Sequence, residues 1–469
     1  MSLRSQVCLL SIVFVFIGGT ALTTHGQDPV RYCIIEGSAL LQIAPDGVVT
    51  RVPLHGTFDL ALSQSADQYL VEQFRGFAPG GNEIITGQGA YVPGPPQQMS
   101  LYVMIGGELV HLDSGVVPSE TWMPMISIDL VQDPISPDEP WYALHLIAVP
   151  AYPPWFSTDT SFHQSNGQLI SDGDVLTTCG AVLWDNDDLT EELGIMPPVP
   201  DIGCDALYPM EIDGPLWWEA WFSAEVDVFS ETLGLLKHGD FLSEGGFVVA
   251  TNEELLEMFW PEPPLWDYGL DAITWGWWCA GWYFSTEADF FSQSMGQWVG
   301  HGDLLCAHDG WIVFRNSDLL ANFSPPPIPY DYGLDAVYMW PSGHMWFSVE
   351  EGFLDENHGW ISDGDLLSTE GWVIYRNLQM VRRFEPVEDL DNFGLDALHV
   401  VPVQRGDMNG DMRVNSYDID GFILALGSPD LYYEIYPELN PDVVGDCNYD
   451  GVLNAYDIDG FIALIGSGG

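Results

Sequence analysis

The chain has 469 residues, 47% of them hydrophobic, so it is long and apolar enough to form roughly two to four domains. It contains 69 acidic residues against 11 basic ones, which gives a net charge of −58 at pH 7. Nucleic acids and anionic lipids attract clustered lysine and arginine, so this charge excludes nucleic acid as a partner and argues against docking on an anionic membrane. The acidity suits a solvated surface in salty surroundings, and calcium binding by part of the carboxylates is compatible with that explanation.

Residues 1–26 have the pattern of a secretory signal peptide. Arg4 supplies the positive charge at its start, and the apolar run of residues 7–17 is too short to span a bilayer. Small residues follow, with a candidate cleavage site at 24–26. No later segment has about 20 uninterrupted apolar residues. We therefore expect no membrane insertion, and a product that is secreted, periplasmic or attached to the cell surface.

Residues 27–142 are expected to form a β-rich N-terminal region. Hairpin-like runs occur here, for example residues 102–112 around Gly106 and Gly107. The repeat pattern of the next segment is missing. This region is therefore either a separate β domain or a set of degenerate units of the same body.

Residues 143–403 contain four copies of one unit, with a period of 62–66 residues between Phe-Ser elements that start at 156, 222, 284 and 347. Each unit opens with a short strand after a Gly-Leu-Asp-Ala element, which is degenerate in its first copy. It continues with Phe-Ser-x-Asp/Glu and a Gly-Asp element, and its third strand ends at an asparagine that we expect to cap a short helix. The Gly-Leu-Asp-Ala elements are 203–206, 269–272, 333–336 and 394–397, the Gly-Asp aspartates are Asp174, Asp240, Asp303 and Asp365, and the asparagines are Asn186, Asn252, Asn316 and Asn377.

Strand-rich units of this length are typical of β-propeller blades with an added short helix, or of a β-solenoid. The run Ala-Leu-His-Leu at 143–146 resembles Ala-Leu-His-Val at 397–400, so the opening strand occurs five times and the rest of the unit four times. An additional terminal strand would close a ring. We therefore predict a mainly β fold with a β-propeller-like body of four units over residues 143–403.

The carboxylates that recur in every unit have three candidate roles: capping turns, binding calcium, or forming the carboxylate pair of a glycoside hydrolase. A carboxylate repeated in every unit usually has a structural role, whereas a catalytic pair is usually unique in a chain. We therefore favour a structural role over calcium binding, and calcium binding over catalysis, and we assign no catalytic residue.

The 19 tryptophans make a carbohydrate a candidate partner of the body, because an exposed indole ring stacks on sugar rings. Trp217, Trp275 and Trp277 are the surface candidates. The tryptophans that precede Phe-Ser elements are expected in the core, and these are Trp155, Trp221 and Trp346.

Six of the seven cysteines follow the signal peptide, and an even number permits disulfides in an exported protein. The spacing suggests that Cys179 pairs with Cys204 and Cys279 with Cys306, each within one repeat unit. Buried free thiols are the alternative.

Two segments that start 39 residues apart, 406–427 and 445–466, nearly copy each other. Each places oxygen-bearing side chains at positions 1, 3, 5, 9 and 12 of a twelve-residue loop, followed by apolar residues at helical spacing. Calcium takes about six to eight oxygen ligands, which a short loop supplies when alternate side chains point inward and position 7 offers its carbonyl. We therefore predict two Ca²⁺ ions. The predicted ligands are Asp407, Asn409, Asp411, Arg413, Asn415 and Asp418 in loop one, and Asp446, Asn448, Asp450, Val452, Asn454 and Asp457 in loop two.

Residues 405–469 resemble the type I dockerin family in this tandem loop-and-helix pattern and in the Asp at position 12. The resemblance implies a small α-helical module that folds with calcium and docks onto a cohesin-like scaffold protein. It also implies that loop positions 10 and 11 contact the partner. These positions hold Ser416 and Tyr417 in loop one and Ala455 and Tyr456 in loop two, where the family often has a Ser-Thr type pair.

Three functions are consistent with these features. The favoured one is a secreted calcium-binding modular protein, which its C-terminal module docks to a scaffold or surface partner while the repeat body binds a ligand. The second is a dockerin-bearing hydrolase in polysaccharide catabolism, which would be a glycoside hydrolase. The third is a structural exported protein in which calcium only stabilises the fold.

Overall fold

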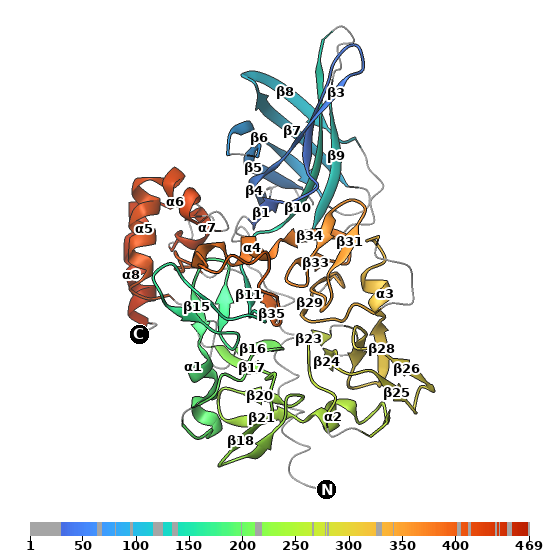
Figure 1. The fold of residues 1–469 in the computed structure, drawn as a ribbon. Coiled ribbons are helices and arrows are strands. Elements are labelled where there is room, and N and C mark those ends of the chain that lie inside the picture. Colours follow the sequence, from blue (N-terminus) through green and yellow to red (C-terminus); the bar gives the residue numbers. More distant parts are fainter. Residues whose placement is uncertain are drawn as a thin grey trace.

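The structure is a computed structural model that describes most of the chain. The described residues are 30–62, 68–79, 81–93, 97–115, 125–133, 139–197, 199–211, 218–264, 267–276, 278, 281–324, 331–340, 342–400, 405–410, 414–436, 439, 441–447 and 453–467. The fold is mainly β and has three parts: an eight-stranded closed barrel, a body of many small sheets, and a helical C-terminal module (Figure 1). None of the helices in the described ranges is long and apolar enough to cross a membrane. The expected signal peptide lies outside those ranges.

The barrel is an antiparallel sheet in which most strands pair with their neighbours in sequence. Its order is β1-β4-β5-β6-β7-β8-β9-β10, and β1 pairs with β10 to close it. The β2-β3 hairpin extends from the first half of β10. The strands are β1 (Val30–Ile34), β2 (Ala39–Ile43), β3 (Val49–Pro53), β4 (His55–Leu62), β5 (Tyr69–Phe77), β6 (Glu83–Val92), β7 (Gln98–Ile105), β8 (Glu108–Asp113), β9 (Ile126–Gln132) and β10 (Trp141–Pro150).

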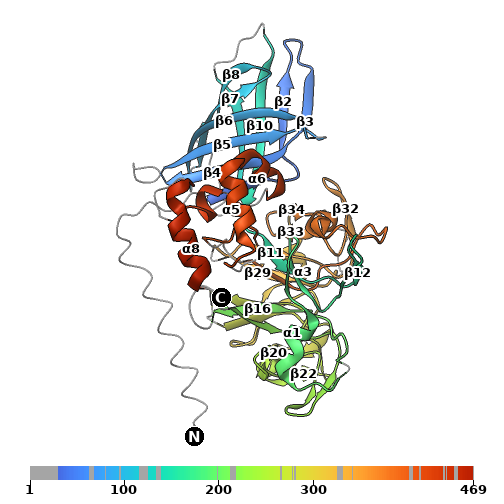
Figure 2. The ribbon, with the colours of Figure 1, turned by 90° about the vertical axis from the view of Figure 1, so that its left-hand side faces the viewer.

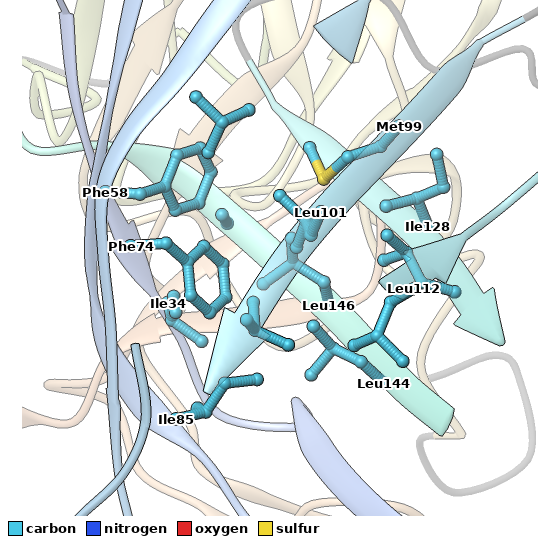
Figure 3. Close-up of a cluster of buried hydrophobic side chains, with 14 of the residues drawn as sticks. Ile34, Phe58, Phe74, Ile85, Met99, Leu101, Leu112, Ile128, Leu144 and Leu146 are labelled. Atoms are coloured by element: carbon cyan, nitrogen blue, oxygen red, sulfur yellow. The ribbon is translucent and has the colours of Figure 1, made fainter. Parts of the chain in front are cut away.

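Apolar side chains fill the barrel interior (Figure 3). Successive side chains of a strand point to opposite faces, and β7 accordingly alternates between buried and more exposed residues. Phe58 and Phe74 are fully buried and stack with ring centroids 5.6 Å apart. Arg31 and Asp59 form a buried ion pair at 3.2 Å. The barrel therefore has the compact apolar core of an independent β domain.

The repeat body contains four antiparallel four-stranded sheets, each with a two-stranded hairpin inserted between its second and third strands and a short helix after its fourth. The first sheet is β35 (Leu398–Val400), β11 (Pro154–Phe156), β14 (Val175–Thr177) and β15 (Val182–Trp184). The second is β16 (Leu207–Glu211), β17 (Trp218–Phe222), β20 (Phe241–Ser243) and β21 (Phe247–Ala250). The third is β23 (Ile273–Gly276), β24 (Gly281–Phe284), β27 (Leu304–Cys306) and β28 (Trp311–Phe314), and the fourth is β29 (Val337–Met339), β30 (Met345–Phe347), β33 (Leu366–Ser368) and β34 (Trp372–Tyr375).

The inserted hairpins and the helices repeat in the same order. The hairpins are β12 (Phe162–His163) with β13 (Leu169–Ile170), β18 (Val228–Ser230) with β19 (Gly234–Leu236), β25 (Phe290–Ser292) with β26 (Gln297–Val299), and β31 (Phe353–Asp355) with β32 (Gly359–Ile361). The short β22 (Pro261–Glu262) joins the third hairpin. The helices are α1 (Asn186–Thr190), α2 (Asn252–Leu256), α3 (Asn316–Leu319) and α4 (Asn377–Met380), and the 3₁₀ turns η3 (Glu191–Leu193) and η4 (Arg382–Phe384) follow the first and the last of them.

The C-terminal end of the body completes its first sheet. β35 pairs with β11, so Phe156 lies opposite Leu398 across more than 240 residues of sequence. The prediction that residues 143–146 form an opening strand of the repeats is wrong, because these residues lie in β10 and pair with β9 and β2 in the barrel. An alternating apolar pattern indicates which side chains of a strand are buried, but it does not determine which other strand pairs with it.

The first strands of the four sheets, β35, β16, β23 and β29, are called here the opening strands. Each contacts the next, and β29 also contacts β35, so the contacts form a closed cycle in the middle of the body (Figure 1). Buried serines of the Phe-Ser elements bridge neighbouring sheets in the same cyclic order. Their hydroxyls donate to carbonyl oxygens of the next unit: Ser157 to Cys204 (2.5 Å), Ser223 to Leu270 (2.7 Å), Ser285 to Leu334 (2.8 Å) and Ser348 to Leu395 (2.9 Å).

The Gly-Asp aspartates have the structural role that we favoured. In the second unit, Asp240 accepts hydrogen bonds from the backbone N–H groups of Lys237 (3.1 Å) and Asn252 (3.1 Å), which ties a turn to the start of α2. Equivalent pairs of backbone bonds reach the other three aspartates. Our expectation that the asparagines are N-caps is wrong, because Thr251 is the residue that caps α2. The Asn252 side chain instead accepts a hydrogen bond from Tyr268 N–H and donates one to the Gly269 carbonyl. This side chain holds the segment that leads into the next opening strand.

The C-terminal module contains α5 (Asp418–Gly427), α6 (Pro429–Ile435), α7 (Pro441–Val444), the 3₁₀ turn η5 (Ala455–Asp457) and α8 (Ile458–Ser467). Its core centres on Phe422 and Phe461, whose rings stack 4.0 Å apart and nearly parallel. The module also contacts the body, because the Arg383 guanidinium lies 5.8 Å from the centroid of the Tyr436 ring. In Figures 1 and 2 the helices lie beside the junction of barrel and body.

The predicted pairing of Cys179 with Cys204 is wrong. Cys204 is a free, fully buried thiol in the Gly-Cys-Asp-Ala element, where the other units have leucine, and it packs among apolar side chains such as Trp155 and Leu207. The thiol therefore fills a leucine position in the core. Cys279 lies outside the described residues, so its pairing with Cys306 stays a prediction.

Candidate metal centres

The first predicted calcium loop is closed by the carboxylate at its twelfth position. Asp418 is fully buried and accepts hydrogen bonds from the backbone N–H groups of Met408 (2.7 Å) and Asn415 (2.8 Å). Asp407, at position 1, is also fully buried and accepts from Gly410 N–H at 2.7 Å. The loop thus turns its first and last carboxylates inward, as a calcium loop requires.

The second loop repeats this arrangement. Asp457 is fully buried and accepts from Asn454 N–H at 2.7 Å, the counterpart of the bond from Asn415 to Asp418. Asp446, at position 1, is 1% exposed and pairs with Arg405 at 3.2 Å. Both carboxylates again lie inside the module.

A glycine in each helix lets its loop approach closely. A Cβ atom on Gly421 would lie 2.7 Å from the Met408 carbonyl oxygen, and one on Gly460 would lie 2.6 Å from that of Cys447. Both distances are too short for any side chain. The two halves of the module are therefore equivalent in packing as well as in sequence.

The described part of each loop fits a hard cation. The predicted ligands that the structure describes offer carboxylate or amide oxygens to an ion, and calcium prefers such oxygen donors. They are Asp407, Asn409, Asn415, Asp418, Asp446, Asn454 and Asp457. The other predicted ligands, Asp411, Arg413, Asn448, Asp450 and Val452, lie outside the described residues.

The predicted contact positions lie on the surface of the module. Tyr417 is 77% exposed and Tyr456 is 83% exposed, and Ser416 and Ala455 are exposed beside them. On the helices themselves, Ile419 and Ile423 are 40% and 61% exposed, and Ile458 and Ile462 are 39% and 60% exposed. The members of each pair are four residues apart, so they lie on one face of their helix. Of the apolar residues expected at helical spacing, Phe422 and Phe461 thus face the core, whereas these isoleucines extend an exposed apolar stripe on each helix.

A second set of carboxylates gathers in the repeat body. The four Phe-Ser-x-Asp/Glu carboxylates, called here the rim carboxylates, are exposed, and each lies against the positive-φ glycine of a Gly-Leu-Asp-Ala element. A Cβ on Gly203, for example, would lie 2.4 Å from the Glu225 carboxyl carbon, so only glycine leaves room there. The rim carboxylates are Asp159, Glu225, Glu287 and Glu350, which face Gly394, Gly203, Gly269 and Gly333 respectively.

The aspartates of the Gly-Leu-Asp-Ala elements lie just inside this rim. These four residues, called here the axial aspartates, are between 6% and 8% exposed, and they are Asp205, Asp271, Asp335 and Asp396. Burial, and then neighbouring carboxylates, raises the pKa of each well above its ordinary value. Glu225 is exposed at one side only, and partial burial of its carboxylate, followed by neighbouring carboxylates, raises its pKa to about 7.

The sequence did not single out the axial aspartates as site residues. They stood in the repeat as part of a strand-opening element, and their exact recurrence at one position was the available signal. Their convergence depends on closure of the cycle of opening strands, which pairs β35 with β11.

Comparisons of the chain with known protein families, with curated proteins and with solved structures found no match.

Proposed function

We propose that this protein is a calcium-dependent docking protein, in which the C-terminal module binds a cohesin-like scaffold or surface protein and the repeat body binds a ligand. The observation that carries the proposal is the pair of equivalent exposed apolar stripes on the module. Large apolar side chains exposed together mark interaction sites more often than single ones do. The inward carboxylates of both loops support calcium as the ion that holds these stripes in place.

The near-symmetry of the module suggests two equivalent docking faces. Ile419 and Ile423 form one stripe, with Tyr417 exposed at the start of its helix, and Ile458 and Ile462 form the other, with Tyr456 exposed in the same way. Tyrosine supplies a large contact area with a polar end, which suits a protein interface. Because the two stripes match, either one can present the same surface to a partner.

For the body we propose a four-bladed, β-propeller-like ring. The cyclic contacts of the opening strands, the pairing of β35 with β11 and the cyclic serine hydrogen bonds all support this architecture. Propellers commonly close their ring by combining strands from both chain ends in one blade. The body is then a rigid platform that carries ligand sites on its surface.

A groove in the second unit is the candidate ligand site of the body. It has a volume of about 590 Å³ and is lined by residues including Trp260, Glu253 and Glu257. Trp260 is 64% exposed, so its ring face is available to stack on a sugar. Of the surface tryptophans expected from the sequence, Trp275 is instead half-buried against Trp282, and Trp217 and Trp277 lie outside the described residues. Trp155 and Trp346 are buried as predicted, whereas Trp221 is only half-buried.

The docking proposal is tested with the full chain immobilised and incubated with type I cohesin domains and with envelope proteins of the source organism, in calcium and in chelator. We expect calcium-dependent capture. A variant with Tyr417→Asp and Ile423→Asp, or one with Tyr456→Asp and Ile462→Asp, should retain capture through the other stripe. The variant that combines all four substitutions should bind the partner at least about tenfold more weakly, because charged groups would be buried in the interface.

The matched control is Tyr102→Asp, which changes an exposed tyrosine of the barrel. Capture that persists in chelator, or in the fourfold variant, contradicts the proposal. No capture by a chain that is folded in calcium would leave calcium as a stabiliser only. Release of sugar from a polysaccharide panel would instead favour the hydrolase.

A further inference from the structure

The middle of the repeat body brings carboxylates together from all four units. The opening strands meet there (Figure 1). One axial aspartate lies two residues before the first residue of each strand. Two groups of three carboxylates have ligand oxygens within 4.8 Å of one another. Asp159, Asp335 and Asp396 form the first group, and Asp205, Glu225 and Asp396 form the second. Asp396 belongs to both, so the five residues make one continuous cluster.

Two buried oxygens of the axial aspartates lack a hydrogen bond. Oδ2 of Asp396 and Oδ2 of Asp271 receive no hydrogen bond from an N–H or O–H donor of the described residues, although these side chains are only 8% and 6% exposed. Their side-chain neighbours at hydrogen-bonding range are carboxylates, Asp159 beside Asp396 and Glu350 beside Asp271, which could bond to them only by sharing a proton. A buried carboxylate oxygen without a donor is costly, since burial removes the water that would otherwise solvate it. For Asp396 this oxygen belongs to the carboxylate that both groups share.

The charges around the cluster add to this cost. The ionisable groups that act most strongly on the axial aspartates are themselves carboxylates, including Glu225, Glu350 and Asp159. Like charges a few ångströms apart in a partly buried site repel each other more strongly than they would in water, because the effective dielectric constant there is lower. Such a cluster requires either bound protons or a bound cation.

The surroundings of the cluster resemble a prepared site with one open side. The rim carboxylates are exposed, and the rim glycines leave space for them. Further along the opening strands, His399 lies between Tyr208 and Tyr338, with ring centroids 5.1 and 5.2 Å away. These aromatic rings lie three residues beyond the aspartates on the opening strands, whereas the carboxylates on the other side are exposed. The rim is therefore the side from which an ion would reach the axial aspartates.

We propose that Asp159, Asp205, Glu225, Asp335 and Asp396 bind a calcium ion in the middle of the repeat body. The donor set is made of carboxylate oxygens only, which selects a hard cation over zinc or copper. Calcium accepts irregular shells with carboxylates that bind through one or both oxygens, whereas magnesium requires a near-ideal octahedron. The ion joins residues of the first, second and fourth sheets and so links the two ends of the cyclic body. This site is separate from the C-terminal loops and does not depend on their function.

The test measures bound calcium per full-length chain after chelation, dialysis against calcium and removal of free ion. A variant with Asp335→Asn and Asp396→Asn should hold one ion fewer than its parent. The same loss should appear in a background with Asp418→Ala and Asp457→Ala, which disables the C-terminal loops. Because the comparison is between variant and parent, occupancy of those loops does not affect it.

Thermal unfolding supplies a second measurement. In chelator, the double Asn variant should melt at the same temperature as its parent or higher, since it removes repelling charges. In calcium, the parent should gain several degrees that the variant lacks, because an ion that binds only the native state stabilises it. Glu225→Gln, on the exposed rim, is a milder variant that should weaken this gain without loss of folding.

The matched control is Asp365→Asn. Asp365 is also a buried repeat carboxylate, but it accepts backbone bonds from Ser362 (3.2 Å) and Asn377 (2.9 Å) and pairs with Arg376 at 2.8 Å. Its variant should lose the same stability in calcium and in chelator, and it should bind as many ions as the parent. An unchanged ion count in the double Asn variant, or an unchanged calcium-dependent gain in melting temperature, would overturn the proposal and leave shared protons as the explanation of the cluster.

Discussion

The barrel and the repeat body both close on themselves, but they enclose opposite chemistry. The barrel is one sheet whose first and last strands pair, and apolar side chains fill it (Figure 3). The body is a cycle of four sheets closed by β35 and β11, and carboxylates gather where its opening strands meet. The buried polar groups of the two parts differ as well: Asp59 has Arg31 beside it, whereas the axial aspartates have other carboxylates.

This difference shows how closure can leave room for a function. A barrel that is packed with apolar residues is stabilised by the burial itself and needs nothing more. In the body, the apolar clusters lie between the sheets, and the middle of the cycle is held by hydrogen bonds from the Phe-Ser serines. That arrangement keeps a cluster of carboxylates in the middle of the body.

The largest effect is expected from a cavity in the barrel. Phe58 is fully buried and stacks on Tyr32 (5.4 Å) and Phe74 (5.6 Å). Phe58→Ala should lower the free energy of unfolding of the barrel by about 3–5 kcal/mol, measured by urea unfolding. Leu109→Ala is the control, because Leu109 is 70% exposed on the barrel surface. A small loss for Phe58→Ala would mean that the barrel is not held by its apolar core.

Much of the contrast between barrel and body could be predicted from the sequence. The main feature that was predicted wrongly, the partner of one strand, has a physical reason. The period of the Phe-Ser elements correctly indicated four strand-rich units, and the recurrence of the Gly-Asp aspartates correctly favoured a structural role. Residues 143–146 were counted as an additional opening strand beside 397–400, because both runs carry the same apolar alternation, but only the second run belongs to the body. Strand partners depend on tertiary closure, which a local pattern does not contain.

The same limit decides which candidate metal ligands could be predicted from the sequence. The spacing of oxygen side chains selected Asp407, Asp418, Asp446 and Asp457, and all four turn out to be buried at the starts and ends of their loops. A calcium loop is local, so its geometry follows from short-range spacing. Asp205 and Asp396 lie 191 residues apart in the sequence and come together only through the cyclic contacts of the opening strands.

The second-largest effect concerns the pH dependence of stability. In the body, a buried histidine and the buried carboxylates change the stability in opposite directions as the pH falls. Burial between Tyr208 and Tyr338 lowers the pKa of His399 to about 3. The unfolded chain binds this proton at about pH 6.5, so the stability contributed by neutral His399 is complete above that pH and is lost as the pH falls toward 3. At pH 5 the loss is about 2 kcal/mol.

His399→Phe should remove this loss, so that stability between pH 7 and pH 5 falls less in the variant than in the parent. The measurement is urea unfolding at several pH values, compared between the two proteins. The carboxylates with raised pKa act in the opposite direction, because they are protonated more readily in the folded state. Taking the difference between variant and parent cancels their effect. Equal slopes in both proteins would show that His399 is not buried in its neutral form.

A smaller effect is expected from one of the bridging serines. The Ser223 hydroxyl accepts from Ala206 N–H (2.9 Å) in its own sheet and donates to the Leu270 carbonyl (2.7 Å) of the next unit. Ser223→Ala should cost about 1 kcal/mol in unfolding of the body, because two buried backbone groups lose a partner. Ser165→Ala, which changes an exposed serine bonded to Glu385, should leave stability unchanged. Equal effects of both substitutions would mean that the inter-sheet bonds do not hold the cycle.

The smallest effect is expected from the surface pair that spans the same closure. Glu388 accepts from His163 N–H at 2.9 Å and lies 2.9 Å from His163 Nδ1, so it joins the first unit to the end of the fourth. The hydrogen bond from the His163 side chain lowers the pKa of Glu388. Exposed pairs of this kind are screened by water and salt and contribute little. Glu388→Gln should therefore leave the urea midpoint of the body unchanged at physiological salt. If it instead lowered the midpoint as much as Ser223→Ala, ring closure would depend on a surface contact. In that case the surface contact would close the body, and the pairing of β35 with β11 would follow from that closure.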